Sequence, residues 1–293
     1  MTAAEEGVLL LSCLLPGQMR PLTMPQLQEL GRRARAYGMG GDDPLRELTA
    51  RDLARLGYDA AEQTHILQLL SRGETLRAYL SRAAAQDIFP VTRLDARYPQ
   101  RLRQRLGPRC PAVLFAKGDP ALLSARCISV VGSRALAPQG RAFAETAGRL
   151  IAGSLYSICS GGAAGADRAA QDACLAAGGS AVIFPADSLL THPALPGVLY
   201  LAEQAYDMPF SAARALGRNR LIHAMGEKTL VAQCTCGSGG TWEGTTENLH
   251  RGYSPVFVCD DGSNAMQALV SRGAVPVRQL DRLDVLQPMQ LHF

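Results

Sequence analysis

Three glycine turns and a cluster of arginines are the parts of this sequence that could bind an anion. Gly132-Ser133-Arg134 follows the apolar run Cys127–Val131, and Pro138 then begins a helical pattern. A strand that enters a helix through a glycine turn leaves backbone N–H groups free at the helix start, where a phosphate can bind. An arginine beside the turn can hold that phosphate through two N–H groups. The turn therefore predicts a phosphate-binding site.

The same arrangement recurs further along the chain. The loop 160–167, with the sequence Ser-Gly-Gly-Ala-Ala-Gly-Ala-Asp, follows an apolar run, and glycines at 237–240 precede another helical pattern. In an open parallel sheet, ligands bind beyond the carboxyl ends of the strands. We therefore expect these loops to meet in one crevice. The residues expected to bind DNA or phosphate are Gly132, Ser133, Arg134, Gly161, Gly162, Ala163, Arg218, Asn219, Arg220, Gly237, Ser238, Gly239, Gly240 and Thr241.

Composition and motifs narrow the class of protein. The chain has 293 residues, of which 47% are hydrophobic and 19% charged, and a net charge of +4, which permits a polyanionic partner without requiring one. The glycine loops match neither the GxxxxGK[ST] phosphate loop nor a GxGxxG turn, which disfavours an ATPase or an ordinary dinucleotide enzyme. We expect no cofactor.

The cysteines and the N-terminus indicate a protein of the reducing cytoplasm. Eight cysteines are scattered along the chain, and Cys234-Thr-Cys236 has no partners at the spacing of a structural zinc site, so we expect thiols and no metal. The apolar run Val8–Leu15 is too short to cross a bilayer and follows two acidic residues, so we expect no membrane association and no signal peptide.

The hydrophobic pattern predicts two domains. Residues 1–87 are expected to be helical, with helices at about 23–37, 60–70 and 74–85 and a cap at Thr49–Asp52 that starts a short helix closed by Gly57. Two short helices joined at a glycine are typical of helix-hairpin-helix modules that bind nucleic-acid backbones, and equally of a small bundle that serves packing. We expect a Rossmann-like domain at 88–280 and a short tail at 281–293.

Strands and helices are predicted to alternate in the second domain. We expect strands at about 88–93, 111–119, 127–131, 155–159, 180–184, 228–233 and 255–259, and a proline-rich crossover after residue 184 through Pro196. Helices are expected at 100–106, 217–225 and 265–272. Three more are expected: one that begins at Pro138, one that follows the loop 160–167 and ends at about residue 177, and one that begins at the glycines from 237. Such alternation indicates an α/β fold with a parallel sheet and helices on both faces.

The ordered motifs resemble one known family. Val-Val-Gly-Ser-Arg134, the loop 160–167, Gly-Arg-Asn-Arg220 and Gly-Ser-Gly239 are similar to motifs of the DprA/Smf family of DNA-processing proteins, as are the segments 98–102 and 111–119. The resemblance covers about residues 88–277. It implies a cytoplasmic, dimeric protein that binds single-stranded DNA and loads the recombinase RecA during natural transformation. It also implies that Arg134 and the arginines at 218 and 220 contact DNA phosphates.

Three features depart from the family pattern. The second glycine loop has Ala164 where the family has a basic residue, and Gln171 stands where the family has a histidine. The winged helix that often follows the family's core is not expected in the short C-terminal tail. The lost cation weakens the expectation of a long phosphate track.

The third glycine turn supports an alternative function. Gly239-Gly-Thr-Trp-Glu243, with Glu247 one turn later, resembles the motif of LOG-type phosphoribohydrolases, in which a glutamate and an arginine act on the N-glycosidic bond. By that resemblance Glu243, Glu247 and Arg218 would be catalytic. The acids could instead stabilise the helix start through its dipole. A sensor that binds a nucleotide signal without cleaving it stays open as well.

Two aromatic side chains near these loops allow opposite interpretations. Trp242, the chain's sole tryptophan, could stack on a base or be buried against a neighbouring helix. His223 follows the Arg-Asn-Arg segment and would make a pH-sensitive contact if exposed, or simply pack if buried.

Overall fold

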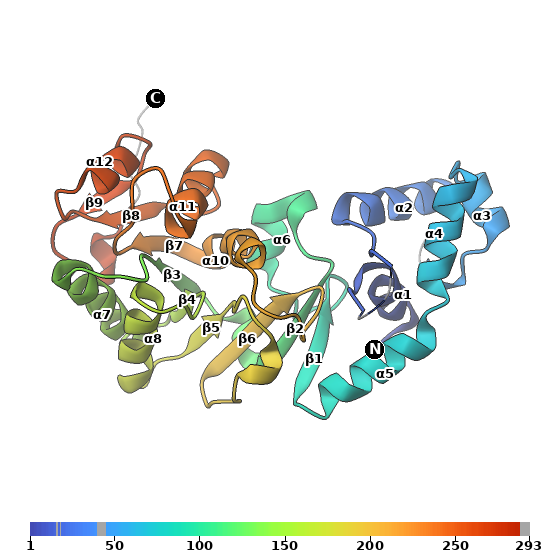
Figure 1. Cartoon of the computed structure of the whole chain (residues 1–293), viewed down its shortest axis with the longest axis horizontal. Coiled ribbons are helices and arrows are strands. Elements are labelled where there is room, and N and C mark those ends of the chain that lie inside the picture. Colours follow the sequence, from blue (N-terminus) through green and yellow to red (C-terminus); the bar gives the residue numbers. More distant parts are fainter. Residues whose placement is uncertain (16, 18, 40–44, 288–293) are drawn as a thin grey trace. The chain divides into compact units, whose positions relative to one another are not determined.

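The structure is a computed structural model that describes residues 1–15, 17, 19–39 and 45–287. Its described residues form two compact units (Figure 1). The first contains Met1–Tyr98, Leu106–Ala116 and Ala202–Tyr206, and the second contains Pro99–Arg105, Lys117–Leu201 and residues from Asp207 onward. The last six residues of the predicted C-terminal tail, 288–293, lie outside the described residues.

The first unit begins with five α-helices, most of which start at a capping box. Thr2, Thr23, Thr49 and Asp59 each stand before a helix whose third residue carries a side chain that reaches back to the cap, as predicted for Thr49. The short helix α3 ends just before Gly57, which has the left-handed φ of 78° that glycine adopts without strain. The helices are α1 (Ala3–Ser12), α2 (Met24–Ala36), α3 (Ala50–Arg55), α4 (Ala60–Leu70) and α5 (Gly73–Ala84).

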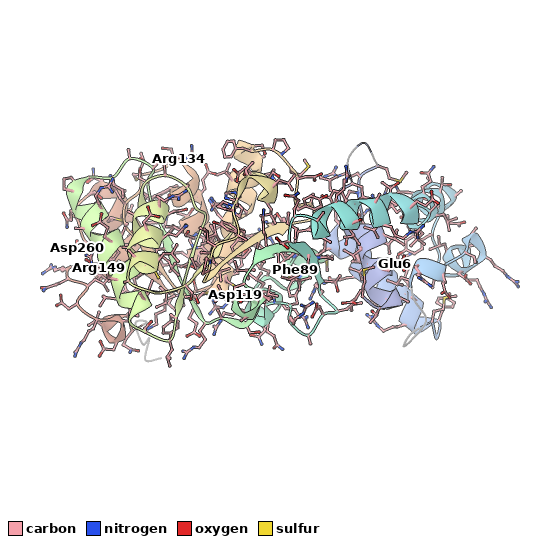
Figure 2. The ribbon with its side chains drawn as sticks, turned by 90° about the horizontal axis from the view of Figure 1, so that it is seen from below. Glu6, Phe89, Asp119, Arg134, Arg149 and Asp260 are labelled. Atoms are coloured by element: carbon pink, nitrogen blue, oxygen red, sulfur yellow. The ribbon has the colours of Figure 1, made fainter. Side chains whose placement is uncertain are left out.

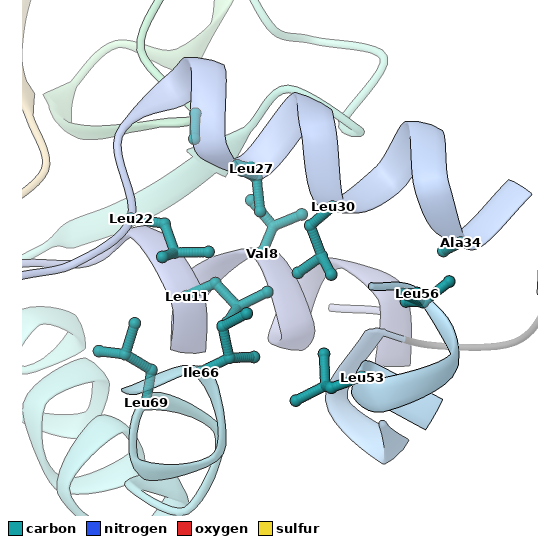
Figure 3. Packing of buried hydrophobic residues seen from close by; sticks show 11 residues of the cluster. Val8, Leu11, Leu22, Leu27, Leu30, Ala34, Leu53, Leu56, Ile66 and Leu69 are labelled. Carbon is teal, nitrogen blue, oxygen red and sulfur yellow. The ribbon is translucent and has the colours of Figure 1, made fainter. Parts of the chain in front are cut away.

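A cluster of buried aliphatic side chains holds α1 to α4 together (Figure 3). Val8 and Leu11 come from α1, Leu30 from α2, and Leu53 and Ile66 from α3 and α4. The short helices α3 and α4 therefore turn their apolar sides to this core. Whether their outer sides bind nucleic acid stays a prediction.

Two strands of the first unit follow the helices, so this compact unit extends beyond residue 87. β1 (Ile88–Thr92) and most of β2 (Val113–Gly118) belong to this unit. The ring of Tyr79 on α5 lies 5.8 Å from that of Phe115 on β2 and 4.3 Å from that of Tyr206. This aromatic cluster packs strand residues against α5. The local residue pattern, from which the boundary was predicted, contains no sign of this contact.

The second unit is built on a parallel sheet with the strand order β6-β5-β4-β3-β7-β8-β9. β3 is buried along its whole length and pairs with both β4 and β7. The sheet grows from β3 in opposite directions along the chain, which makes the edge between β3 and β7 the switch point. The strands are β3 (Cys127–Val131), β4 (Ser157–Ser160), β5 (Ala181–Ile183), β6 (Val198–Glu203), β7 (Gly226–Val231), β8 (Val256–Cys259) and β9 (Val275–Val277).

Helices cover both faces of this sheet, as predicted (Figure 1). α7 and α8 lie side by side on one face, and α10, α11 and α12 lie on the other. Crossovers between parallel strands are right-handed, and the sheet grows in opposite directions on the two sides of β3. The connecting helices of the two halves therefore lie on opposite faces of the sheet. The helices that follow β1 are α6 (Gln100–Leu106), α7 (Pro138–Ala152), α8 (Ala166–Ala176), α9 (Ala212–Gly217), α10 (Asn219–Met225), α11 (Gly240–Arg251) and α12 (Asn264–Val270). Short 3-10 helices occur in both units, at 45–47, 107–109, 120–124, 189–191 and 283–285.

The segment between Pro196 and residue 217 contains two elements that were not predicted from the sequence. It contains β6, which pairs in parallel with β5, and the helix α9. The run Val198–Glu203 is apolar enough for a buried strand, but the prolines before it concealed its start. None of the helices in the described part of the chain is long and apolar enough to cross a membrane.

Arg72 provides a test of the first unit's packing. Its side chain is buried and donates hydrogen bonds to the carbonyl oxygens of Leu10 (2.9 and 2.6 Å) and Cys13 (2.7 Å) at the end of α1. Arg72→Ala leaves these buried acceptors without a donor and should lower the free energy of unfolding by about 2 kcal/mol or more. Urea denaturation followed by circular dichroism measures this, with exposed Arg51→Ala as the control. Equal stability of both variants would contradict the capping role.

Candidate functional site

A pocket of about 560 Å³ opens at the switch point of the sheet. The loop after β3 and the loop after β7 form two of its sides, and the starts of α8 and α11 and the segment 210–223 form the others. The carboxyl ends of neighbouring parallel strands meet here, which is where such sheets bind ligands. The predicted convergence of the loops therefore agrees with the geometry.

Most of the predicted binding residues line this pocket, and several do not. Those that line it are Gly132, Ser133, Arg134, Ala163, Arg218, Asn219, Ser238, Gly239, Gly240 and Thr241, together with the alternative catalytic residue Glu243. Those absent from its described lining are Gly161, Gly162, Arg220, Gly237 and Glu247. Arg220 donates a hydrogen bond back to the carbonyl oxygen of Gly217, and Glu247 accepts one from the Tyr253 hydroxyl at 3.1 Å.

Arg134 is the exposed cation of the pocket (Figure 2). Its side chain extends from the loop after β3 and forms no ion pair or hydrogen bond among the described residues. The guanidinium carbon lies 6.0 Å from the ring centroid of Phe210, close enough for a weak cation–π contact. The guanidinium therefore keeps its donors available for an anionic ligand.

Arg218 is the deeper cation and is held in place by the second glycine loop. Nη2 donates to the carbonyl oxygen of Gly161 at 3.2 Å, and Nη1 donates to Oδ1 of Asn219 at 2.9 Å. Nε is enclosed and has no hydrogen-bond partner among the described residues. A Cβ on Gly161 would lie 1.9–2.1 Å from the guanidinium, so a larger residue there would displace the Arg218 side chain. Burial lowers the pKa of Arg218, and the nearby Asp167 carboxylate opposes that shift.

Asp167 also holds the second glycine loop in place. Its carboxylate is buried and accepts the backbone N–H of Gly161 at Oδ2, at 3.0 Å. Burial raises the pKa of Asp167, while the Arg218 charge and the N–H groups of Gly161 and Ala163 act in the opposite direction. The motif 160–167 thus contains its own counter-charge for Arg218, a role that the sequence analysis did not assign to Asp167.

Three backbone N–H groups of the first two glycine loops, those of Ser133, Gly161 and Gly162, are already used. Ser133 donates to the carbonyl oxygen of Gln233 at 2.8 Å, and Gly162 donates to Oγ of Ser160 at 3.2 Å. With the Gly161 bond to Asp167, this corrects the expectation that these N–H groups are free for phosphate. The loops are also packed together, because a Cβ on Gly165 would lie 2.1 Å from the Ser133 carbonyl oxygen.

The third glycine loop opens the helix α11, which begins without a side-chain cap, as α7 and α8 do. Gly239 stands before the helix with a φ of 87°, and no described side chain accepts its first-turn N–H groups. Nδ2 of Asn219 donates to the carbonyl oxygen of Gly240 at 2.9 Å and so joins α10 to the start of α11. Donors that remain at this side of the pocket are these N–H groups and the Thr241 hydroxyl.

The structure decides between the alternatives for the two aromatic side chains. Trp242 is 9% exposed, absent from the pocket lining, and packs beneath the guanidinium of Arg272 at 5.1 Å. His223 is 1% exposed and contacts Oγ1 of Thr229 and Nδ2 of Asn248, each at 3.2 Å. Burial lowers the pKa of His223 to about 4, so it is a neutral packed residue at pH 7.

Phe210 is a pocket residue that the sequence analysis missed. It is 56% exposed and lies between β6 and α9, in a stretch for which no element was predicted. A lone aromatic residue after Met208-Pro209 gives no periodic signal, and only the fold brings it beside Arg134. No cluster of three or more residues suited to holding a metal ion occurs in the described ranges.

Comparison with known proteins identifies the family. A family model described as DNA recombination-mediator protein A matches residues 90–286, which is most of the chain. The chain belongs to this family. Comparison with curated proteins gave no match.

Two solved structures share the fold. DNA processing protein A (DprA) from Streptococcus pneumoniae is 24% identical, with a TM-score of 0.75 over 100% of this chain and 99% of that one. DNA processing protein A from Helicobacter pylori, a structure that concerns its single-stranded DNA binding mode, is 21% identical, with a TM-score of 0.55 over 66% of this chain and 91% of that one. At these identities the likeness supports the Rossmann-like fold.

Gly161 allows a test of the pocket's internal support. Gly161→Ala forces the added methyl group against the Arg218 guanidinium and should lower the free energy of unfolding by roughly 1–3 kcal/mol. Gly153→Ala is the control, because its Cβ would lie 3.8 Å from the nearest atoms and its φ is −77°. Urea denaturation of both variants compares them. Equal stability would show that Arg218 is not held against this loop.

His223 should make stability depend on pH. Its pKa is about 4 in the folded protein and about 6.5 in the unfolded chain, so the unfolded state binds the proton first as the pH falls. Stability is full above the unfolded value and should fall by up to roughly 3 kcal/mol between about pH 7 and about pH 4. Urea denaturation of the wild type and of His223→Gln at both pH values tests this. An equal loss in the two proteins would assign it to other groups.

Proposed function

We propose that this protein binds single-stranded DNA in the switch-point pocket and acts in DNA processing. Membership of the recombination-mediator family supports this, and the unpaired Arg134 guanidinium at the pocket is the observation that carries it. In this proposal Arg134 donates two N–H groups to one backbone phosphate. Arg218 lies deeper and attracts the phosphate by its charge.

The contacts to phosphate come chiefly from side chains and from the start of α11. The N–H groups of Ser133, Gly161 and Gly162 hold the loops together, so in this proposal the phosphate is bound by the Arg134 guanidinium, the Thr241 hydroxyl and the first-turn N–H groups of α11. A helix start with free N–H groups attracts anions. Only a few phosphates fit such a site, which agrees with the absence of a cation at Ala164.

The finer parts of the proposal follow the family resemblance. They are a cytoplasmic location, a homodimer, loading of a RecA-type recombinase onto the bound strand during natural transformation, an accessory role for the helical domain at residues 1–87 and a DNA-binding Rossmann-like domain at 88–280. Sedimentation of the purified protein tests the dimer, and co-purification of recombinase with protein-coated single strands tests the partner.

A nucleotide-cleaving function receives support from one residue only. Glu243 lines the pocket, but Glu247 is directed to Tyr253, and Arg218 is hydrogen-bonded to the loop that holds it. Release of a base from mononucleotides, followed by chromatography, tests this second candidate. Turnover that Glu243→Gln abolishes would establish it, and a mononucleotide that raises the Tm without releasing its base would indicate a nucleotide signal that is bound intact.

Replacing Arg134 should weaken DNA binding. Arg134→Ala removes the charged donor and should lower the affinity for a single strand of about 20 nucleotides by roughly 10- to 100-fold. The slope of log affinity against log salt should also become shallower by about 0.7 for the lost phosphate contact. Fluorescence anisotropy at several salt concentrations measures both quantities.

A matched control lies on α7. Arg149 is an exposed arginine in its last turn, outside the pocket lining (Figure 2). Arg149→Ala removes the same charge and should leave affinity and salt slope almost unchanged. If Arg149→Ala and Arg134→Ala have equal effects, binding depends on net charge, and the pocket is not the DNA site.

A further inference from the structure

We propose that the second unit has a further contact for DNA at the end of β3 opposite the pocket, where three arginines hold the backbone of the same strand. Arg101, Arg105 and Arg126, grouped around Glu227, are called the arginine cluster. This inference rests on the proposed DNA binding and extends it. The pocket lining has two arginines and two carboxylates, so it offers a long polyanion no excess positive charge. Cations elsewhere are therefore needed if a long strand is to be held.

The topology of the sheet assembles the arginine cluster from distant parts of the chain. Arg126 stands just before β3, Tyr156 just before β4, and Glu227 is the second residue of β7. The strand order β4-β3-β7 places these three strand beginnings side by side, and α6 adds Arg101 and Arg105. All of these residues belong to the second unit. The pocket lies beyond the carboxyl ends of the strands, so the arginine cluster lies at the opposite edge of the sheet.

One carboxylate fixes the orientation of two of the guanidinium groups. Arg126 donates from Nε to Oε1 of Glu227 at 2.8 Å and from Nη2 to Oε2 at 3.0 Å. Arg101 also donates to Oε1, and the Tyr156 hydroxyl donates to Oε2 at 3.0 Å. The hydrogen bonds from Arg126 are the first cause that lowers the pKa of Glu227 to about 2, so the carboxylate stays charged. The guanidinium groups are therefore oriented before a ligand arrives.

The arginine cluster has more positive than negative charge. Glu227 is the one acid that pairs with its arginines in the described part of the chain. Arg105 donates instead to the carbonyl oxygens of Ala224, at 3.3 Å, and Gly226, which carry no net charge. Three arginines against one carboxylate leave two positive charges uncompensated. The Arg126 side chain is 53% exposed and that of Glu227 only 17%, so a cation faces the solvent while the acid is covered.

A DNA strand held in the pocket can reach the arginine cluster. Arg126 and Arg134 flank β3 and are eight residues apart, which is at most about 29 Å. A strand of about 20 nucleotides covers about 68 Å even at the 3.4 Å phosphate spacing of a duplex strand. Once Arg134 holds one phosphate, the others of the same strand are at a high effective concentration beside the second unit. Contacts too weak to hold a separate acidic protein therefore suffice for the attached strand.

The ion pairs of the arginine cluster could also serve folding alone, by joining α6 to the sheet. An exposed ion pair contributes about 0–1 kcal/mol to stability. That contribution changes the free energy of unfolding and does not depend on the length of a DNA strand. A dependence on strand length therefore separates a binding role from a purely structural one.

The first test removes the most exposed cation of the arginine cluster. Arg126→Ala leaves Glu227 bonded to Arg101 and Tyr156, so the network persists. The variant should bind oligothymidine of about 20 nucleotides roughly 3- to 10-fold more weakly, with a salt slope shallower by about 0.7. A strand of about 6 nucleotides covers only about 20 Å and should bind as to the wild type. Arg134→Ala should weaken both strands. Fluorescence anisotropy at several salt concentrations measures these effects.

The second test removes the acid and should act in the opposite direction. Glu227→Gln leaves the three arginines without their counter-charge and should strengthen binding of the 20-nucleotide strand by roughly 2- to 5-fold. A purely structural network predicts lower stability and no gain in affinity. Arg278 and Asp260 are the matched control, because they form an exposed ion pair at 3.1 Å outside the arginine cluster and the pocket lining. Arg278→Ala and Asp260→Asn should bind both strands like the wild type.

The outcomes separate this inference from the proposed function. If Arg126→Ala and Glu227→Gln bind the long strand like their controls while Arg134→Ala weakens it, the second contact is wrong and the pocket stands. If Arg126→Ala weakens the long strand and Arg134→Ala does not, the arginine cluster binds DNA and the pocket proposal is wrong. If no strand binds but polyglutamate binds the wild type and not Arg126→Ala, the partner is an acidic protein segment, and the inference is wrong.

Discussion

The buried side of the pocket depends on Arg218. Its guanidinium lies directly on Gly161, donates to that residue's carbonyl oxygen, and has the Asp167 carboxylate as its counter-charge. The neighbouring Asn219 bonds to the first residue of α11. Two adjacent residues at the start of α10 therefore connect the second glycine loop to the third. A charge that is enclosed without such partners would cost several kilocalories per mole, so loop and arginine constrain each other.

This internal bonding determines how the pocket can bind a ligand. The N–H groups that a glycine turn commonly offers to phosphate are used here by Gln233, Asp167 and Ser160. Recognition is thereby transferred to side chains and to the uncapped start of α11. Because the lining has two arginines and two carboxylates, long-range attraction is weak, and affinity has to come from contacts at short range. Such a site selects for shape and for donor and acceptor positions as well as for charge.

The sequence predicted the alternation of elements well because each signal is local. Capping boxes, glycine stops and short β-branched runs fixed most boundaries, as at Thr49, Gly57 and Cys127–Val131. It missed β6, since the prolines before it resemble a loop, and it missed Phe210, which no periodicity marks. It also could not show that the Ser133 N–H is used, because the acceptor, Gln233, is 100 residues away in the chain. Long-range pairing of this kind has no local signature.

The spacing of the two glutamates shows the same limit within one helix. Residues four apart lie on one face, so Glu243 and Glu247 were expected to act together. Four residues also rise about 6 Å along the helix axis, and over that distance the surroundings change from the pocket to the Tyr253 hydroxyl. A single unpaired carboxylate remains in the pocket, and the arginine that would assist it is committed to the loop at Gly161. Cleavage of a glycosidic bond needs a pair of groups that are free to contact the bond and correctly oriented toward it. The arrangement found here is better suited to holding a nucleotide than to breaking one.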